Sequence, residues 1–225
     1  MFLFWTMLIF FFASFLQVLV LRWVPPIFTS FMAIRKAEMV IMGGNDKINY
    51  NWKPYEEISE YFALAVVAAE DQKFSEHYGF DLKAIETAIE KNKTQTKIKG
   101  ASTISQQVAK NLFCWPGKSY LRKAIESYYT LLLELLLNKN RILEVYINIA
   151  ELGPGIYGAE AAAKIYFKKS ANKISRNEAA LLAAVLPSPK RYSVRNPSAY
   201  VQRRAEWIKR QMNQLGGKKY LEKIQ

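Results

Sequence analysis

Glu70 occupies the position in this chain that most favours acid–base chemistry. It follows the apolar run Ala65–Ala69 and precedes Asp71, so two carboxylates stand at the end of a hydrophobic helical segment. A carboxylate in such surroundings loses hydration, its pKa rises, and it accepts a proton more readily near neutral pH. A helix C-terminus is also an unfavourable place for a negative charge. Glu70 is therefore a candidate general base, although an ordinary exposed helix end is the simpler alternative from this segment alone.

His77 and Cys114 are each the only residue of their type. Because no second histidine or nearby nucleophile accompanies His77, a catalytic triad is excluded. We predict that His77 is structural and that its hydrogen bonds hold the turn at Gly79. A single cysteine excludes an intramolecular disulfide, and no Cys/His cluster offers a zinc site.

Hydroxyl and amide side chains gather where another helix is predicted to begin. The segment Thr103-Ile104-Ser105-Gln106 has the pattern of a capping box. Polar groups at a helix N-terminus suit a phosphate or sugar oxygen, and a lysine nearby adds a cation. The candidate ligand-binding residues are Ser102, Thr103, Gln106, Gln107 and Lys110. The basic run at 91–99 before them is either a solvated loop or a site of attraction for anionic lipid.

A second group of cations precedes another glutamate. Lys118, Arg122 and Lys123 come just before Glu126, and a helix would place Arg122 and Glu126 on one face because they are four residues apart. Taken alone, this pattern indicates a surface ion pair worth well under about 1 kcal/mol. Beside an anionic ligand, the same cations would neutralise its charge.

Two matches to known motifs do not support the chemistry that they suggest. Gly153-x-Gly155-x-x-Gly158 fits a dinucleotide fingerprint, but a helix is predicted before it and Pro154 lacks an amide donor, so close helix packing explains it better. Ser170-x-x-Lys173 fits the first motif of penicillin-type acyl transfer, but its partner motifs do not occur. No dedicated metal-ligand set is visible either, because Asp46, Asp71 and Asp81 are the only aspartates.

The elements that must position these residues are predicted to be almost all helical. Apolar residues recur at intervals of three and four, and no alternating run persists long enough for a convincing strand. We predict an anchor at 1–23, an extended linker at 24–49 and one mainly α domain at 50–225. The expected helices cover Ile58–Glu70, Leu82–Ile89, a segment opening at Thr103, Leu121–Leu137, Ile142–Leu152, Ala159–Phe167, Asn177–Leu186 and Ser198–Leu215.

The N-terminus predicts a membrane anchor. No charged side chain occurs from Met1 to Leu21, a length that would cross the roughly 30 Å core of a bilayer as a helix. A signal peptide is the alternative, but no basic segment precedes the run and no small-x-small cleavage site follows it. Arg22, Arg35 and Lys36 would by charge counting stay in the cytoplasm, but long domains translocate largely regardless of charge.

The charge balance also narrows the class of partner. The formal net charge is +13, which favours an anionic partner such as nucleic acid, anionic lipid or a phosphorylated substrate. The predicted membrane anchor makes nucleic acid the poorest of the three.

The motifs occur in an order that resembles one family. The first is Glu70-Asp71-x-x-Phe74-x-x-His77-x-Gly79-x-Asp81, and the second is Gly100-x-Ser102-Thr103-Ile104-x-Gln106-Gln107-x-x-Lys110-Asn111. The others are Arg122-Lys123-x-x-Glu126, Arg141-Ile142-Leu143-Glu144-x-Tyr146-x-Asn148, Gly153 to Phe167, and Glu178 to Ala183. This series resembles the peptidoglycan glycosyltransferases, glycosyltransferase family 51, which polymerise lipid II. Because no transpeptidase domain follows Gln225, the chain resembles the monofunctional, membrane-anchored form.

The resemblance implies a lysozyme-like, two-lobed α fold and an inverting transferase. Glu70 would take the proton from the C4 hydroxyl of an acceptor N-acetylglucosamine, which attacks C1 of the donor muramyl unit and forms a β-1,4 bond. Glu126 resembles the family's second essential glutamate, which would orient Arg122 or Lys110 or assist proton transfer. Lys110, Lys118, Arg122 and Lys123 would neutralise the departing pyrophosphate. Similar enzymes carry arginine at the position of Lys118, so charge is kept there but bidentate geometry is lost.

The resemblance also implies the surroundings of the enzyme. Ser102, Thr103, Gln106 and Gln107 would line the donor site, and Mg²⁺ or Mn²⁺ could screen the pyrophosphate. The partners would be lipid II, the growing glycan, membrane lipids and other cell-wall synthesis proteins, and not nucleic acid. The domain would lie on the extracytoplasmic side of a bacterial inner membrane. A lysozyme-like hydrolase or lytic transglycosylase and a non-catalytic scaffold are the rival functions, but a hydrolase has no use for cations beside a diphosphate.

Overall fold

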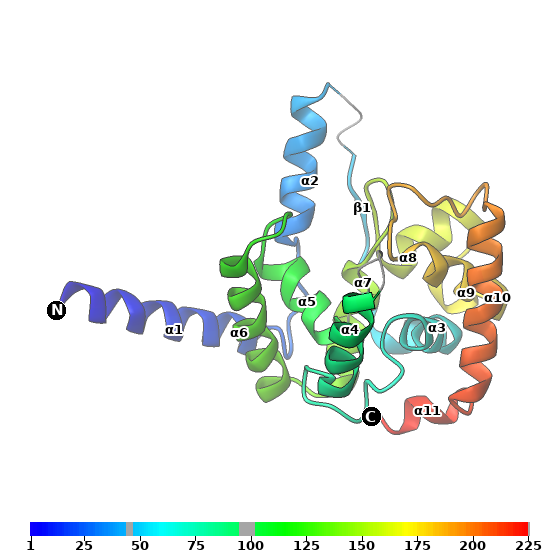
Figure 1. Ribbon diagram of the computed structural model, residues 1–225. Coiled ribbons are helices and arrows are strands. Elements are labelled where there is room, and N and C mark those ends of the chain that lie inside the picture. The colour runs from blue at the N-terminus through cyan, green and yellow to red at the C-terminus, as the bar shows by residue number, and fades with distance from the viewer. Residues whose placement is uncertain (44–46, 95–101, 225) are drawn as a thin grey trace.

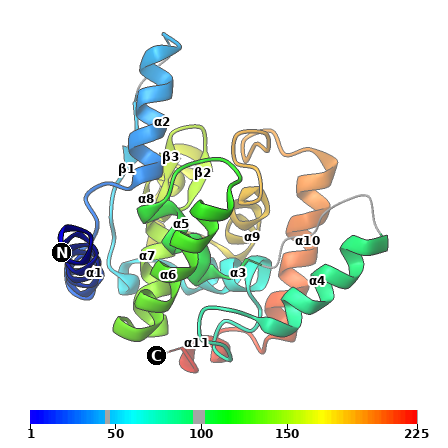
Figure 2. The same cartoon turned by 60° about the vertical axis from the view of Figure 1, so that its left-hand side comes forward.

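The chain forms a mainly helical structure, as predicted. The computed structural model describes residues 1–43, 47–94 and 102–224 (Figure 1). Residues 44–46, the later part of the predicted basic run and Gly100 lie outside these residues. Figures 1 and 2 show one group of helices, α5 to α7, on one side of α3, with α9 and α10 on the other side.

Helix α3 (Glu60–Glu70) is the buried centre of the domain. Its residues from Phe62 to Ala68 are all buried. It packs against α9 (Arg176–Val185), α10 (Ala199–Gln214), α11 (Lys219–Glu222) and α7 (Lys139–Ile149). Small alanine and valine side chains allow these neighbours to approach from several sides, and the helix ends at the first polar residues, Glu70 and Asp71.

A second group of helices packs beside α3. Helix α5 (Ile104–Phe113) contacts α6 (Tyr120–Leu136) and α7, and α4 (Leu82–Thr94) precedes them in the chain. Three of these helices begin at residues that the sequence favours as N-caps. The side chains of Thr103, Ser119 and Asn138 accept hydrogen bonds from the backbone N–H groups of Gln106, Arg122 and Arg141.

The expectation that the domain has no strands is wrong at one small sheet. Strands β1 (Asn49–Tyr50), β3 (Ile156–Tyr157) and β2 (Glu151–Gly153) lie in that order, with β1 parallel and β2 antiparallel to β3. Strands of two or three residues are too short to show an alternating pattern. The strand β2 also explains why α7 ends at Ile149 and not at Leu152.

The helix predicted at Ala159–Phe167 divides into α8 (Gly158–Ala162) and a π-helical turn, η2 (Ala163–Phe167). Two short 3₁₀ turns, η1 and η3, cover Tyr55–Glu57 and Ala171–Lys173.

The glycines of the rejected dinucleotide motif serve close packing, as predicted. A Cβ atom at Gly153 would lie 2.0 Å from the hydroxyl oxygen of Tyr166. At Gly158, where φ is +79°, a Cβ atom would lie 2.2 Å from the backbone oxygen of Asn148 on α7. The motif therefore brings the sheet and α8 against α7 and does not cradle a phosphate.

Gly158→Ala is expected to destabilise the fold by about 2–4 kcal/mol, because it adds a backbone collision to a left-handed φ. Gly117→Ala is the matched control: φ there is +111° but no atom lies within 4 Å of the added Cβ, so we expect a loss of only about 1 kcal/mol. Thermal unfolding of the two variants measures the difference. Equal losses would show that the contact with α7 contributes nothing.

The N-terminal region differs from the prediction in two ways. Helix α1 (Phe2–Val20) forms, but among the described residues no helix combines the length and the apolar character that crossing a bilayer requires. The transmembrane helix predicted at 1–23 is therefore not found. The linker predicted to be extended at 24–49 contains α2 (Ser30–Ile41), because the two prolines prevent a helix only locally and Thr29 caps a new one.

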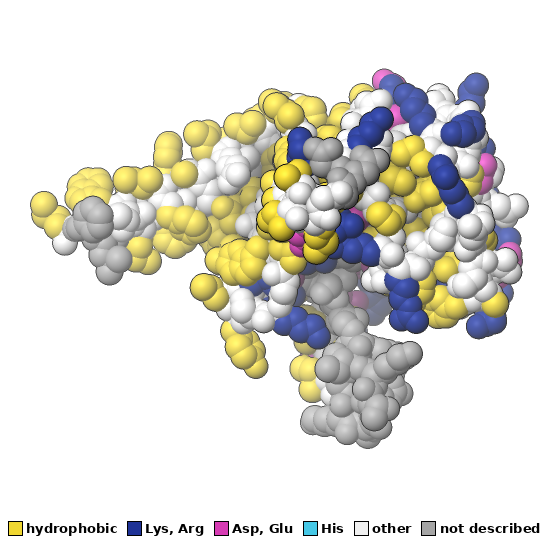
Figure 3. Space-filling view, turned by 90° about the horizontal axis from the view of Figure 1, so that it is seen from above, with side chains coloured by type: hydrophobic (Ala, Val, Ile, Leu, Met, Phe, Trp, Pro, Cys, Tyr) yellow, Lys and Arg dark blue, Asp and Glu magenta, His cyan; other side chains and the backbone are white. Residues whose placement is uncertain are grey.

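Helix α1 extends from the domain and contacts it along α6 (Figure 1). The hydroxyl groups of Ser14 and Tyr128 lie 2.6 Å apart, and the rings of Phe10 and Phe11 pack against the Tyr128 ring. Much of the remaining surface of α1 is apolar and exposed, as Figure 3 shows; Phe4 and Phe12 are 63% and 68% exposed.

Candidate active site

Glu70 lies at the C-terminal end of α3 with its side chain only 13% exposed. Its Oε2 accepts a hydrogen bond of 2.8 Å from Nε2 of Gln107. Its Oε1 is buried without a hydrogen-bond partner and lies 3.6 Å from a guanidinium nitrogen of Arg204. Burial raises the pKa of Glu70 above its ordinary value, while Gln107, Arg204 and Lys110 act in the opposite direction. One carboxylate oxygen is thus held and the other has no hydrogen-bond donor, as a general base requires.

Gln107 fixes the orientation of Glu70 through a chain of hydrogen bonds that joins three helices. The hydroxyl of Tyr146 on α7 donates to Oε1 of Gln107 at 2.9 Å, so the amide NH₂ of Gln107 faces the carboxylate. Burial raises the pKa of Tyr146 well above its ordinary value, which keeps its phenol protonated as the donor. Tyr146 on α7, Gln107 on α5 and Glu70 on α3 therefore form one connected unit.

Gln107→Leu is expected to move the acid limb of the pH–activity profile to higher pH. The hydrogen bond from Gln107 favours the ionised form of Glu70 and so lowers its pKa, whereas burial raises it. Losing this hydrogen bond therefore raises the pKa of Glu70 further. Glu70 is then protonated, and inactive as a base, at a pH where the unmodified enzyme still works. Activity measured across pH 4–9 tests this. An acid limb that stays in place, with only the maximum lowered, would contradict the role assigned to Gln107.

The cations predicted beside Glu126 are held by that residue. Glu126 is only 3% exposed, and its two oxygens lie 2.6 Å from a guanidinium nitrogen of Arg122 and 2.6 Å from the ammonium of Lys123. A buried carboxylate with both oxygens paired to cations holds those partners in place. Glu126 is therefore well placed to orient Arg122 and Lys123.

Lys110 connects the two glutamates electrostatically. Burial lowers the pKa of Lys110, while Glu126 and Glu70 raise it and Arg122 and Lys123 lower it. Charged groups from α3 and α6 therefore all act on Lys110 of α5. The structure thus brings together a carboxylate base and a cluster of three cations, Lys110, Arg122 and Lys123.

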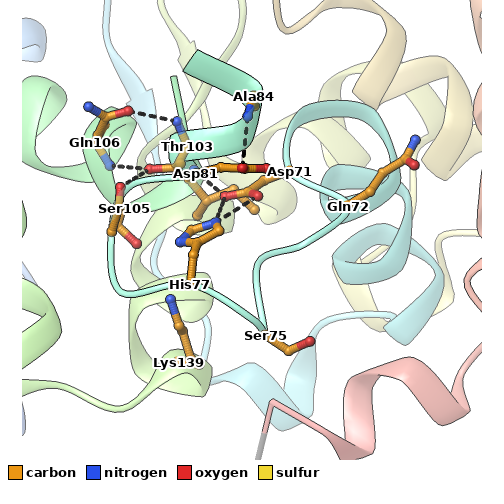
Figure 4. Close-up of polar contacts among 12 residues, drawn as sticks. Asp71, Gln72, Ser75, His77, Asp81, Ala84, Thr103, Ser105, Gln106 and Lys139 are labelled. Atoms are coloured by element: carbon orange, nitrogen blue, oxygen red, sulfur yellow. Dashed lines mark hydrogen bonds and ion pairs between the residues drawn. The ribbon is translucent and has the colours of Figure 1, made fainter. Parts of the chain in front are cut away.

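Asp71 and its neighbours form the framework beneath this site (Figure 4). Oδ1 of Asp71 lies 2.9 Å from Nε2 of His77, and Oδ2 accepts a hydrogen bond of 3.0 Å from the backbone N–H of Ile104 at the start of α5. Thr103 donates to the backbone oxygen of Gly79 at 2.6 Å. The structural role predicted for His77 is confirmed, because Asp71 and His77 secure the segment that leads to Gly79.

The capping box predicted at Thr103 is also confirmed. The Thr103 hydroxyl oxygen accepts a hydrogen bond from the backbone N–H of Gln106, and the Gln106 side chain accepts one from the backbone N–H of Thr103 (Figure 4). Both side chains are 3% exposed. The polar atoms of Thr103 and Gln106 make hydrogen bonds within the fold, which favours a supporting role for both residues. Their direct contact with a donor substrate stays a prediction.

Two predicted residues stand apart from the cluster and one further residue joins it. Ser102 and Lys118 are exposed and make no hydrogen bond or ion pair with the described part of the chain, so their substrate contacts stay predictions.

Arg204 on α10 faces Glu70 but was not among the residues predicted from the sequence. One arginine in a basic amphipathic helix gives no signal in the sequence that distinguishes it from its neighbours.

The charged groups of the site do not fit a dedicated metal ion. Within the described ranges, no group of three or more His, Cys, Asp and Glu side chains could hold one. Both oxygens of Glu126 are paired with cations, and Glu70 is engaged by Gln107 and Arg204. We derive no step of the reaction through Mg²⁺ or Mn²⁺.

Comparison with known proteins identifies the family. A family model described as Transglycosylase matches residues 37–213. Among curated relatives, the biosynthetic peptidoglycan transglycosylase of Pseudomonas entomophila is 53% identical over 204 residues, which cover 91% of this chain and 86% of the relative. The protein of the same name from Pseudomonas syringae pv. tomato is 53% identical over 209 residues, which cover 93% of this chain and 89% of the relative.

The chain therefore belongs to the transglycosylase family, and it is a glycosyltransferase. The family resemblance drawn from the motifs is confirmed. The matched range begins within α2 and ends within α10, so it includes every residue of the cluster around Glu70.

Proposed function

We propose that this enzyme polymerises lipid II into β-1,4-linked glycan strands of peptidoglycan. The observation that supports this most is one helix-end carboxylate with a raised pKa beside a cluster of cations. A diphosphate leaving group needs its charge neutralised more than it needs a proton. The relatives named as biosynthetic peptidoglycan transglycosylases support the same substrate class.

In the proposed reaction, Oε1 of Glu70 removes the proton from the C4 hydroxyl of the acceptor N-acetylglucosamine. The oxygen attacks C1 of the donor muramyl unit as the bond to the pyrophosphate breaks, and the pyrophosphate leaves with that electron pair. Attack from the opposite face turns an α linkage into a β linkage. Lys110, Arg122 and Lys123 stabilise the negative charge that develops on the departing undecaprenyl pyrophosphate.

Glu126 acts in this proposal as a positioning residue. Its two short ion pairs hold Arg122 and Lys123 against the repulsion between them. Lys118 and Ser102, which are exposed, would meet the substrate at the edge of the site. The two helical groups on either side of α3 would form the two lobes of a lysozyme-like fold with the substrate between them.

We further propose that α1 attaches the enzyme to the extracytoplasmic face of a bacterial cytoplasmic membrane. Exposed aromatic and aliphatic side chains along α1 support membrane contact. A substrate with an undecaprenyl chain also requires the site to lie near a membrane. Other cell-wall synthesis proteins would be its partners there.

Incubating the purified full chain separately with lipid II and with finished glycan strands tests the proposed function. We expect lipid II to be consumed into polymer and the finished strands to stay intact. Digestion of the strands without polymerisation of lipid II would identify a hydrolase or lytic transglycosylase instead. Consumption of neither substrate would indicate a non-catalytic scaffold.

A further inference from the structure

A cavity of about 510 Å³ lies where α1 joins the domain. Its walls come from Arg22 and Trp23, which follow α1, and from the end of α6 and the start of α7, including Leu135, Asn140 and Arg141. We call this the junction pocket. The reaction proposed above uses none of these residues.

The junction pocket is separate from the site around Glu70. Arg141 lies in the pocket wall, whereas Tyr146, on the same helix, donates to Gln107. At about 100° per residue, five positions along an α-helix rotate a side chain by about 140° around the axis. Arg141 and Tyr146 therefore point to different sides of α7.

Arg141 contributes a guanidinium whose hydrogen bonds are incomplete. Its Nε donates to the backbone oxygen of Leu21 at 2.8 Å, and Nη1 donates to Glu144 at 2.6 Å. Nη2 is buried with no hydrogen-bond partner. A buried donor on a charged group is costly to leave unpaired, and an oxygen of an anionic ligand would pair it.

The pocket carries an uncompensated positive charge. Glu144, its one carboxylate, is paired with Arg141 and also accepts from the backbone N–H of Tyr55. Arg22 is exposed, stacks over the Trp23 ring at 5.5 Å, and has no carboxylate partner in the described ranges. One guanidinium with an unpaired buried donor and a second with no counter-ion are the kind of groups that an anion would pair.

The position of the pocket indicates the source of the anion. Apolar side chains cover α1 up to its end, and Trp23 and Leu135 at the pocket are 67% and 74% exposed. The charged groups begin at Arg22, directly after the apolar helix. Tryptophan beside arginine at the end of an apolar helix is typical of the level at which lipid headgroups lie.

We propose that the junction pocket binds the phosphodiester of a glycerophospholipid headgroup between Arg22 and Arg141. The proposal rests on the membrane contact of α1 that forms part of the proposed function. A bound lipid would fix the height of the domain above the bilayer. Because the phosphate would touch Arg22, which follows α1, and Arg141 from α7, it would also join the end of that helix to the domain.

Native mass spectrometry of the full chain in detergent, with phosphatidylglycerol added, tests this. We expect Arg22→Gln to weaken lipid retention about tenfold, the loss of one charged contact. The side chain of Arg22 makes no hydrogen bond or ion pair with the described part of the chain, and its backbone N–H, which donates to the Leu19 oxygen, is kept in any variant, so its replacement does not threaten folding. Arg210→Gln, at an exposed arginine on α10, is the matched control and should retain lipid normally.

Two further arms identify the ligand. An uncharged galactolipid, which has no phosphate, should not be retained, and inorganic phosphate at the same concentration should not displace phosphatidylglycerol. Equal retention by Arg22→Gln and the unmodified chain, equal loss in Arg210→Gln, retention of the galactolipid, or displacement by inorganic phosphate would each overturn the proposal. Polymerisation of lipid II by the same samples is scored separately, so a failure of the proposed function is distinguishable from a failure of the lipid site.

Discussion

Glu70→Gln is expected to lower glycan polymerisation about 10²- to 10⁴-fold, the range that general base catalysis contributes. Glutamine keeps the size of the side chain but cannot accept the proton of the acceptor hydroxyl. Binding of lipid II should change little, so the loss should fall on kcat and not on KM. Polymerisation of labelled lipid II at saturating concentration measures it. Glu76→Gln, on the loop after α3, is the control and should leave the rate unchanged.

The same variant is expected to be more stable than the unmodified protein at pH 8. Burial raises the folded-state pKa of Glu70, so the ionised carboxylate costs folding free energy above that pKa, and a neutral amide avoids this cost. As the pH falls below the ordinary glutamate pKa of about 4.3, the carboxyl group is protonated in both states and the advantage disappears. An equal loss of activity and stability at every pH would mean that Glu70 is structural and would contradict its assignment as the base.

Lys110→Met is expected to reduce polymerisation about 10²- to 10³-fold while leaving the fold as stable or more stable. Two glutamates and two cations act electrostatically on this ammonium, and removing one preorganised group that stabilises developing charge typically costs this much. Burial already disfavours the charged form of Lys110, so an apolar side chain of similar length is tolerated. Rate and melting temperature measured on the same preparation separate the two effects.

Lys173→Met, at an exposed lysine in the 3₁₀ turn η3, is the matched control for this substitution and should keep full activity. Lys110→Arg retains the charge and should recover part of the rate. A Lys110→Met enzyme with an undiminished rate would show that the cation near Glu70 does not act on the leaving group.

Local signals in the sequence account for much of the fold. The capping box at Thr103 and the apolar periodicity of α3, α6 and α10 depend on neighbouring residues, and these helices form where predicted. The small sheet and α2 were missed for the same physical reason. The formation of these elements depends on strand pairing or helix capping by only two or three residues. So few residues leave no periodic pattern in the sequence that would predict them.

The candidate site was predictable in its residue types but not in its connections. Glu70, Arg122 and Glu126 lie in motifs with recognisable spacing, whereas the contact between Arg204 and Glu70 joins helices far apart in the chain. Gln107 was predicted to bind substrate, but its amide lies between Tyr146 and Glu70. The hydrogen-bond partners of this buried amide depend on how three helices pack together. No local sequence pattern specifies that packing.

Helix α5 has a consequence for any movement of this enzyme. Gln107 and Lys110 stand one turn apart on α5, and the first turn of that helix is fastened by Asp71, the chain neighbour of Glu70. A slide or tilt of α5 would therefore carry the orienting amide and the ammonium together relative to the base. Proton removal and leaving-group stabilisation would be gained or lost as one event, so a small molecule that wedges α5 away from α3 would disable both at once.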